Sequence, residues 1–404
     1  MGLRIERIEE LLLIAAVVGM LTRRLRLPYT VGLTLAGIGV ALAHISLHVE
    51  LTRELIFTAL LPPLIFEAAL QMHWRELRAD AGVIAVLATV GIVLAAALVA
   101  LGLRYIADWP WAAAIPLGVL ISATDPVSVI ATFKEAGVKG RLRLLVESES
   151  LLNDGTTAAL YTVALAATTG AAVGGGDVAL SFLVTVAGAL VCGALVGAAV
   201  MLLAGRTDDH LVEITLSTIA AYGSFLLAQH FGFSGVLATL TTGLLMGNVT
   251  ALGSFSERGR ESVASFWEYA GFVANSLIFL LIGMRLVAQH VTEVIAVACL
   301  TIALSLLGRA LAVYGCCGLF ARTKQRVSLA HQHLLVWGGL RGALALALAL
   351  GLPDNMPERD AAISVTFAVV AFSILVQGLT MTPLLRRFGE LGPRRAAAKR
   401  QNVV

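Results

Sequence analysis

The sequence predicts an all-α polytopic membrane protein, and three observations carry that prediction. The chain has 404 residues, of which 58% are apolar and only 14% are charged, whereas a soluble domain averages about 45–50% apolar and about 25% charged. The apolar residues gather in runs long enough for membrane helices, which need about 20 residues to cross a bilayer. Lysine and arginine concentrate in alternate connections between those runs, as the positive-inside rule requires. Soluble enzymes, disulfide-linked secreted domains and disordered chains are therefore disfavoured.

Thirteen apolar runs are candidate transmembrane helices. They cover residues 8–22, 28–46, 53–71, 79–103, 111–133, 144–169, 178–204, 211–229, 233–249, 262–287, 291–320, 330–351 and 361–385. With the N-terminus outside and the C-terminus inside, twenty-one of the 29 Lys and Arg residues lie on the inner side and six on the outer side. The last two, Arg309 and Arg341, lie within spans. Thirteen helices divide as six, one and six, which predicts two inverted six-helix repeats joined by a linker helix.

The fifth span places Asp125 directly before Pro126. A residue before proline is driven away from helical geometry, so we expect local unwinding there. Freed carbonyl oxygens beside a carboxylate suit a small hard cation. The alternative is a kinked helix in which Asp125 caps the next half-helix. We favour the cation site, because an aspartate is a costly cap inside a membrane.

The sixth span contains the most polar stretch of any span, Glu147-Ser-Glu-Ser-Leu-Leu-Asn-Asp-Gly-Thr-Thr. Its polar residues of interest are Glu149, Ser150, Asn153 and Asp154. Ser150 and Asp154 are four residues apart and share one helix face, and Glu149 and Asn153 share the neighbouring face. A hydroxyl, an amide and carboxylates therefore converge within two helical turns. Ionisable groups at this depth indicate a functional site by default.

The twelfth span contains Gly338-Gly-Leu-Arg341-Gly. Its glycines permit irregular backbone and close helix contacts, and Arg341 carries a permanent charge that needs an anion. At about 1.5 Å per residue, Asp125, Asp154 and Arg341 lie about 15–21 Å from the ends of their spans. All three are therefore expected near the middle of the bilayer, in a charged network facing a cavity.

These residues carry a family resemblance. Thr124-Asp125-Pro126, Glu149-Ser150 with Asn153-Asp154, Gly338 to Gly342, and Leu61-Pro-Pro-Leu-Ile-Phe-Glu67 resemble the monovalent cation/proton antiporter superfamily. The specific resemblance is to its electroneutral branch, the bacterial NhaP-type antiporters and the animal sodium/hydrogen exchangers. It implies thirteen helices, with a mobile core domain, a dimer domain, and discontinuous fifth and twelfth helices that cross. The implied segments are 1–73 and 209–289 for the dimer domain, 74–172 and 290–388 for the core, 173–208 for the linker, and 389–404 for a short basic cytosolic tail.

The same resemblance assigns roles to residues of this chain. It implies that Asp154 is the carboxylate that binds the cation or the proton, with Na⁺ also held by Asp125, Ser150 and the Thr124 carbonyl. Asn153 is implied as an organising neighbour in that site, and Glu149–Arg341 as a structural ion pair. Three more residues are candidates for lining the cavity or supporting the site: Glu67, Asn275 and Arg309. Glu213 and Glu268 lie near span ends, where we expect them to be interfacial.

The expected function is electroneutral exchange of Na⁺, or Li⁺, for H⁺, because electrogenic relatives carry Asp-Asp where this chain has Asn153-Asp154. The resemblance implies a homodimer, and the short tail favours a bacterial cell membrane protein. No enzyme activity, cofactor or nucleic-acid partner is expected, since no nucleotide-binding or hydrolase motif is present. The alternatives are K⁺/H⁺ exchange on the same scaffold, a cation channel, which needs a filter loop, and an organic-anion symporter.

Overall fold

The structure is a computed structural model, and it describes residues 5–25, 27–44, 51–125, 129–130, 132–133, 136–168, 175–248, 255–289 and 291–391. Within these ranges every regular element is a helix, as the all-α prediction requires. Six helices in the described residues are long and apolar enough to cross a membrane. The number of crossings, their orientation and the inverted repeats stay predictions. The expected unwinding at Pro126 and the expected basic tail from residue 392 onward fall outside the described residues.

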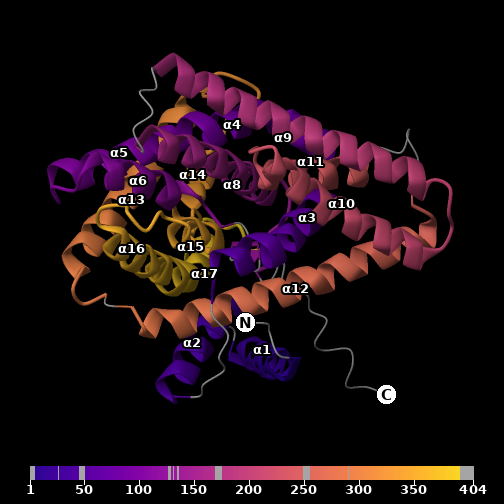
Figure 1. Cartoon of the computed structure of the whole chain (residues 1–404), viewed down its shortest axis with the longest axis horizontal. Coiled ribbons are helices and arrows are strands. Elements are labelled where there is room, and N and C mark those ends of the chain that lie inside the picture. Colours follow the sequence, from indigo (N-terminus) through magenta and orange to yellow (C-terminus); the bar gives the residue numbers. More distant parts are fainter. Residues whose placement is uncertain are drawn as a thin grey trace.

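One group of helices surrounds the long helix α12, which Figure 1 shows running obliquely across the lower part of the view, above α1 and α2. Its members are α1 (Ile5–Leu25), α2 (Tyr29–Leu42), the π-helical η1 (Leu55–Leu60), α3 (Leu61–Gln71), α10 (His210–His230), α11 (Gly235–Asn248) and α12 (Glu257–Val287). α12 packs against α2, α3 and α10, and α11 packs on α3 and on α9 (Gly175–Ala204). Helix α9 lies along the upper edge of the view (Figure 1).

A second group holds the broken helices. Its members are α4 (Trp74–Val86), η2 (Leu87–Gly91), α5 (Ile92–Tyr105), α6 (Trp111–Ser122), α8 (Arg141–Thr168), α13 (Ile295–Leu319), α14 (Leu329–Trp337), α15 (Ala343–Leu350), α16 (Arg359–Phe372), η3 (Ser373–Gln377) and α17 (Gly378–Arg387). α5 packs against α6 and α13, α6 packs against α8, and α15 packs against α16. Segments more than 150 residues apart in sequence therefore share one core.

Close packing of α2 on α12 depends on two glycines. A Cβ atom at Gly37 would lie 2.1 Å from the Leu280 carbonyl oxygen, and one at Gly283 would lie 2.1 Å from the Thr34 carbonyl oxygen. Without side chains, the two backbones come into direct contact, which is how small residues pack membrane helices. This contact fixes the position of α12 beside the cavity described below.

A polar clamp joins α4, α8 and the segment after α13. The Arg141 guanidinium binds both carboxylate oxygens of Asp80, at 2.9 and 2.7 Å, and this hydrogen bonding raises the pKa of Arg141 above its ordinary value. The Gln325 amide is inserted into α4, where it donates to the Ala79 carbonyl at 2.9 Å and accepts from the Val83 N–H at 3.1 Å. One side chain thus bridges a backbone donor and acceptor four residues apart, which binds α4 to a distant segment.

Glu213 lies in the first turn of α10 and is buried against the start of α12, while its expected place at the membrane interface stays a prediction. It is 0% exposed and accepts hydrogen bonds from the backbone N–H of Ser256, at 2.7 Å, and from its hydroxyl, at 3.0 Å. Ser256 is in turn the N-cap of α12, where its Oγ accepts from the Gly259 N–H. A carboxylate at a helix N-terminus is favoured by the exposed N–H groups and the helix dipole. Glu213 therefore secures the start of α12.

Candidate functional site

Helix α8 carries the four polar residues expected in the sixth span, and all four are buried. Glu149 is 0% exposed, Ser150 and Asn153 are 1% exposed, and Asp154 is 5% exposed. Their spacing places them on adjoining faces of one helix. Because burying a carboxylate is costly unless its charge is compensated, this stretch must face other polar groups of the protein.

The chain leaves helical geometry at the end of α6, and this brings Thr124 and Asp125 to α8. α6 ends at Ser122, and Ala123 has the extended angle ψ of 139°. The Thr124 hydroxyl donates to Ser150 Oγ at 3.1 Å. Asp125 is 8% exposed. The two aspartates of the candidate site therefore come from different helices that meet at the Thr124–Ser150 hydrogen bond.

The twelfth predicted span is interrupted beside Asp125. α14 ends at Trp337 and α15 begins at Ala343, and the residues between them are not helical. The Asp125 N–H donates to the Leu340 carbonyl at 2.7 Å, and a Cβ atom at Gly342 would lie 2.5 Å from the Asp125 side chain. The two non-helical segments therefore touch, and glycine at position 342 allows that contact.

The broken segment is supported by two polar residues that sequence reasoning missed. Ser373 Oγ accepts from the Arg341 N–H at 3.0 Å and itself donates to Gln377 Oε1. The Gln377 amide donates to the Trp337 carbonyl at 3.0 Å. Ser373 and Gln377 lie four residues apart in the last span, so their shared face was the available signal. They satisfy backbone groups that the break leaves without helical partners.

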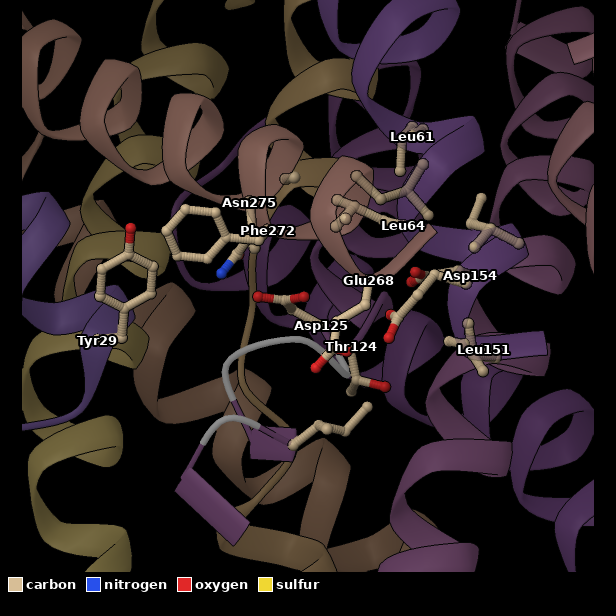
Figure 2. Close-up of a pocket in the computed structure, with 18 of the residues that line it drawn as sticks. Tyr29, Leu61, Leu64, Thr124, Asp125, Leu151, Asp154, Glu268, Phe272 and Asn275 are labelled. Atoms are coloured by element: carbon tan, nitrogen blue, oxygen red, sulfur yellow. The ribbon is translucent and has the colours of Figure 1, made fainter. Parts of the chain in front are cut away.

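A cavity of about 350 Å³ reaches the aspartates. Of the expected site residues, Thr124, Asp125 and Asp154 line it, together with Glu67 and Asn275. Figure 2 shows Asp125 and Thr124 near its centre with Asp154 beside them. Asp154 Oδ1 is buried and has no hydrogen-bond partner among the described residues. A buried carboxylate oxygen facing a cavity without a partner is suited to a proton or a cation.

Ser150 and Asn153 do not line that cavity. Asn153 donates from Nδ2 to Glu149 Oε1 at 3.2 Å, and its Oδ1 accepts from the Thr157 hydroxyl at 3.0 Å. Its amide is therefore engaged on both sides within α8. This geometry fits an organising neighbour better than a direct ligand, while Ser150 reaches the cavity wall through Thr124.

The expected Glu149–Arg341 ion pair is wrong, because Glu149 pairs with Arg309. The Arg309 guanidinium on α13 binds both Glu149 oxygens, at 2.6 and 2.8 Å, and also donates to the Leu335 carbonyl. The planar guanidinium matches a carboxylate in this bidentate geometry. Arg309 was expected only as a residue near the site, and it is the one that neutralises Glu149.

Arg341 instead closes the end of α6. Its Nη1 donates to the carbonyls of Ser122 and Ala123, at 3.3 and 3.1 Å. The last carbonyls of a helix lack intrahelical partners, and the negative end of the helix dipole favours a cation there. Arg341 is 3% exposed, so it places a buried positive charge at the segment that leads into Asp125.

Glu268 is exposed and lines the cavity with Phe272 and Tyr29. Its expected place at the membrane interface stays a prediction. On α12 the residue lies seven positions before Asn275, so both project from one helix face. The helical spacing was the signal that sequence reasoning left unused.

Comparison with known proteins gives consistent matches. Residues 12–387 match the protein family described as sodium/hydrogen exchanger, transmembrane. The chain is 37% identical over 372 residues to the Na⁺/H⁺ antiporter ApNhaP of Aphanothece halophytica, covering 91% of this chain and 71% of that protein. It is 32% identical to the Na⁺/H⁺ antiporter NhaH of Halobacillus dabanensis, covering 95% of this chain and 98% of that protein. A solved structure of the sodium proton antiporter MjNhaP1 from Methanocaldococcus jannaschii has a TM-score of 0.71 at 18% identity, covering 96% of both chains.

Proposed function

Because the chain belongs to the sodium/hydrogen exchanger family, we propose that it exchanges Na⁺ for H⁺ across a membrane, with Asp154 as the group that binds one or the other. The antiporters to which it is 32–37% identical are named for this reaction, and they favour Na⁺ over the K⁺ alternative. The observation that carries the residue assignment is that Asp154 lines the cavity and keeps a buried Oδ1 without a hydrogen-bond partner among the described residues. Asp125, Ser150 and Thr124 complete the proposed oxygen ligand set.

The buried charges around the cavity support one-for-one exchange. Among the described residues the buried ionisable groups here are three carboxylates and two guanidinium groups: Asp125, Glu149, Asp154, Arg309 and Arg341. With every group ionised, the set carries one net negative charge. One Na⁺ or one H⁺ neutralises it. Each crossing then moves a neutral site, so the exchange is electroneutral.

Competition for that one charge couples the two fluxes. Moving an uncompensated buried charge through a low-dielectric region costs several kcal/mol, on the order of the penalty for a buried ion. The empty site is therefore held on one side, while the site with bound Na⁺ or a proton crosses. No separate gate is needed, because the uncompensated negative charge of the empty site itself prevents that site from crossing.

The cavity lies between the two helix groups, as alternating access requires. Glu67 and Asn275 line it from α3 and α12, whereas Asp125 and Asp154 line it from the broken-helix group. We assign the latter group to a mobile core and the former to a dimer domain, with α9 as linker. Thr22 and Arg23 at the end of α1 also line the cavity. Since the positive-inside rule places Arg23 on the cytosolic side, the cavity opens toward the cytosol. We further propose that the protein is a homodimer in a bacterial cell membrane.

The test is ion flux in proteoliposomes carrying an imposed pH gradient. Wild-type protein should dissipate the gradient on addition of Na⁺ or Li⁺, with a rate unaffected by a K⁺-diffusion potential. Asp154→Asn should lower that rate at least about 100-fold, because a neutral amide has no negative charge with which to bind Na⁺ and H⁺ in turn.

The matched control is Asp354→Asn, which makes the same change at a carboxylate whose side chain is 99% exposed, and it should retain the wild-type rate. Well-folded Asp154→Asn with normal Na⁺-driven proton flux would remove the proposed mechanism. A flux that follows the membrane potential would contradict electroneutral exchange.

A further inference from the structure

Helix α12 presents one continuous stripe to the cavity. Glu268, Gly271, Phe272 and Asn275 all line it, and their spacing of three, one and three residues defines a single helix face. The stripe covers about 10 Å along the helix axis at 1.5 Å per residue. It begins at a carboxylate and ends at an amide, so oxygen atoms are available to a cation at both ends.

Asn275 is buried at the C-terminal end of this stripe, and its side-chain oxygen accepts no hydrogen bond from the described residues. The residue is 7% exposed. Buried polar atoms almost always have partners, and an unsatisfied one is costly. A partner that arrives and departs accounts for the group, and the cavity that Asn275 lines is where that partner would be.

The neighbouring residue shows that the orientation of Asn275 is specific. Ser276 Oγ is hydrogen-bonded to the Tyr29 hydroxyl at 2.8 Å and donates to the Phe272 carbonyl at 2.6 Å, so its polar atom is satisfied by the protein, and Ser276 does not itself line the cavity. Figure 2 shows Asn275 on one side of Asp125 and Asp154 on the other. Asn275 and Asp154, each with one buried oxygen that has no partner among the described residues, therefore belong to opposite walls of one cavity.

We propose that Asn275 Oδ1 is an outer ligand for the cation, binding Na⁺ on the wall opposite Asp125 and Asp154 while the ion keeps part of its hydration shell. The inference rests on the proposed Na⁺/H⁺ exchange. A cavity of about 350 Å³ has room for a hydrated ion, since a water occupies about 30 Å³ in the liquid. An amide carbonyl is a suitable hard-cation ligand that adds no charge, so it leaves the one-for-one count unchanged.

The placement makes this ligand one-sided. Asn275 belongs to the helix group opposite the aspartates, so movement of the core separates it from the ion. It therefore contributes to Na⁺ affinity on the side to which this cavity opens and not on the other side. A proton on Asp154 needs no second ligand, so proton affinity should depend on Asn275 much less than Na⁺ affinity.

The experiment measures the apparent KM for Na⁺ separately on the two sides, in everted vesicles and in right-side-out vesicles. Asn275→Ala should raise the KM on the cavity side about fivefold, the effect expected for losing one polar ligand, with the maximal rate kept within about twofold. The KM measured from the other side should not change. Asn275→Asp keeps the oxygen and adds charge, so it should lower the cavity-side KM at least about twofold.

Ser262→Ala is the matched control on the same helix, since the Ser262 hydroxyl donates to the Arg258 carbonyl and neither residue lines the cavity, and its Na⁺ KM should equal that of wild type. An unchanged cavity-side KM in Asn275→Ala, or an equal change on both sides, would overturn the inference. If that variant does not fold, the KM of Asn275→Asp decides the question. Absence of Na⁺-dependent proton flux in wild type would instead contradict the proposed function.

Discussion

At the scale of single residues, the partner of Glu149 shows where sequence reasoning ends. Hydropathy and depth predict that Asp125, Glu149 and Asp154 are buried, because a charge inside a span must face protein or a cavity. Those rules also bury both Arg309 and Arg341, but they do not give the direction of either side chain. The packing of α13 brings Arg309 to Glu149, while the break before α15 turns Arg341 to the end of α6.

The corrected pairing predicts a large stability loss in Arg309→Ala. Removing one partner of a buried ion pair costs about 3–5 kcal/mol, since the other charge is left buried and unpaired. Thermal unfolding in detergent should show this loss for Arg309→Ala. The double variant Glu149→Ala with Arg309→Ala should lose less than the sum of the two single variants. Additive losses would show that the two residues do not form a coupled pair.

At the scale of elements, the break between α14 and α15 can be predicted from the sequence more readily than the hydrogen bonds that stabilise it. Adjacent glycines around Arg341 indicated irregular backbone, and the structure ends α14 at Trp337 and begins α15 at Ala343. The π-helical turn η1 directly precedes Pro62 and Pro63, which lack the N–H groups that would bond back to it. The turns η2 and η3 contain no proline and carry no comparable sequence signal. The hydrogen bonds of Ser373 and Gln377 also needed the structure, since they join two spans.

The contact between the two non-helical segments predicts that Gly342→Ala impairs transport. Its Cβ atom would lie 2.5 Å from the Asp125 side chain, so one of the two must move. We expect the rate of Na⁺/H⁺ exchange in proteoliposomes to fall at least about tenfold, since misplacing a binding group by about 1 Å can cost 100-fold. Gly315→Ala on α13 is the control, because an added Cβ there meets nothing within 4 Å, and its rate should be unchanged. Equal rates for the two variants would refute the role of this contact.

At the scale of the whole molecule, two helix groups from separated parts of the chain enclose one cavity, and the five buried charges at and beside it sum to one net negative charge. The class of membrane protein and the positions of most helices could be predicted, because they follow from hydropathy, which is local. The charge balance of the buried residues could not be predicted, because it depends on which side chains from distant helices meet. In the proposed mechanism, this balance makes Na⁺ and H⁺ mutually exclusive at Asp154.

Mutual exclusion predicts how Na⁺ binding responds to pH. Protons occupy the site as pH falls, so the apparent KM for Na⁺ should rise by up to about tenfold per pH unit on the acid side, as one-proton linkage requires. The maximal rate of Na⁺/Na⁺ exchange should stay nearly constant. Uptake of radioactive Na⁺ into Na⁺-loaded proteoliposomes, with equal pH on both sides, measures both quantities. A KM independent of pH would exclude competition at one site.

The Glu149–Arg309 pair also bears on how the protein is made. The two residues are 160 positions apart, and synthesis proceeds from the N-terminus. Glu149 therefore enters the membrane well before its cation exists, and α8 must wait with an unpaired carboxylate until α13 is inserted. In a chain stopped between them that carboxylate lacks its cation, which is costly inside a membrane. The pair therefore joins the two halves of the chain only after both have been made.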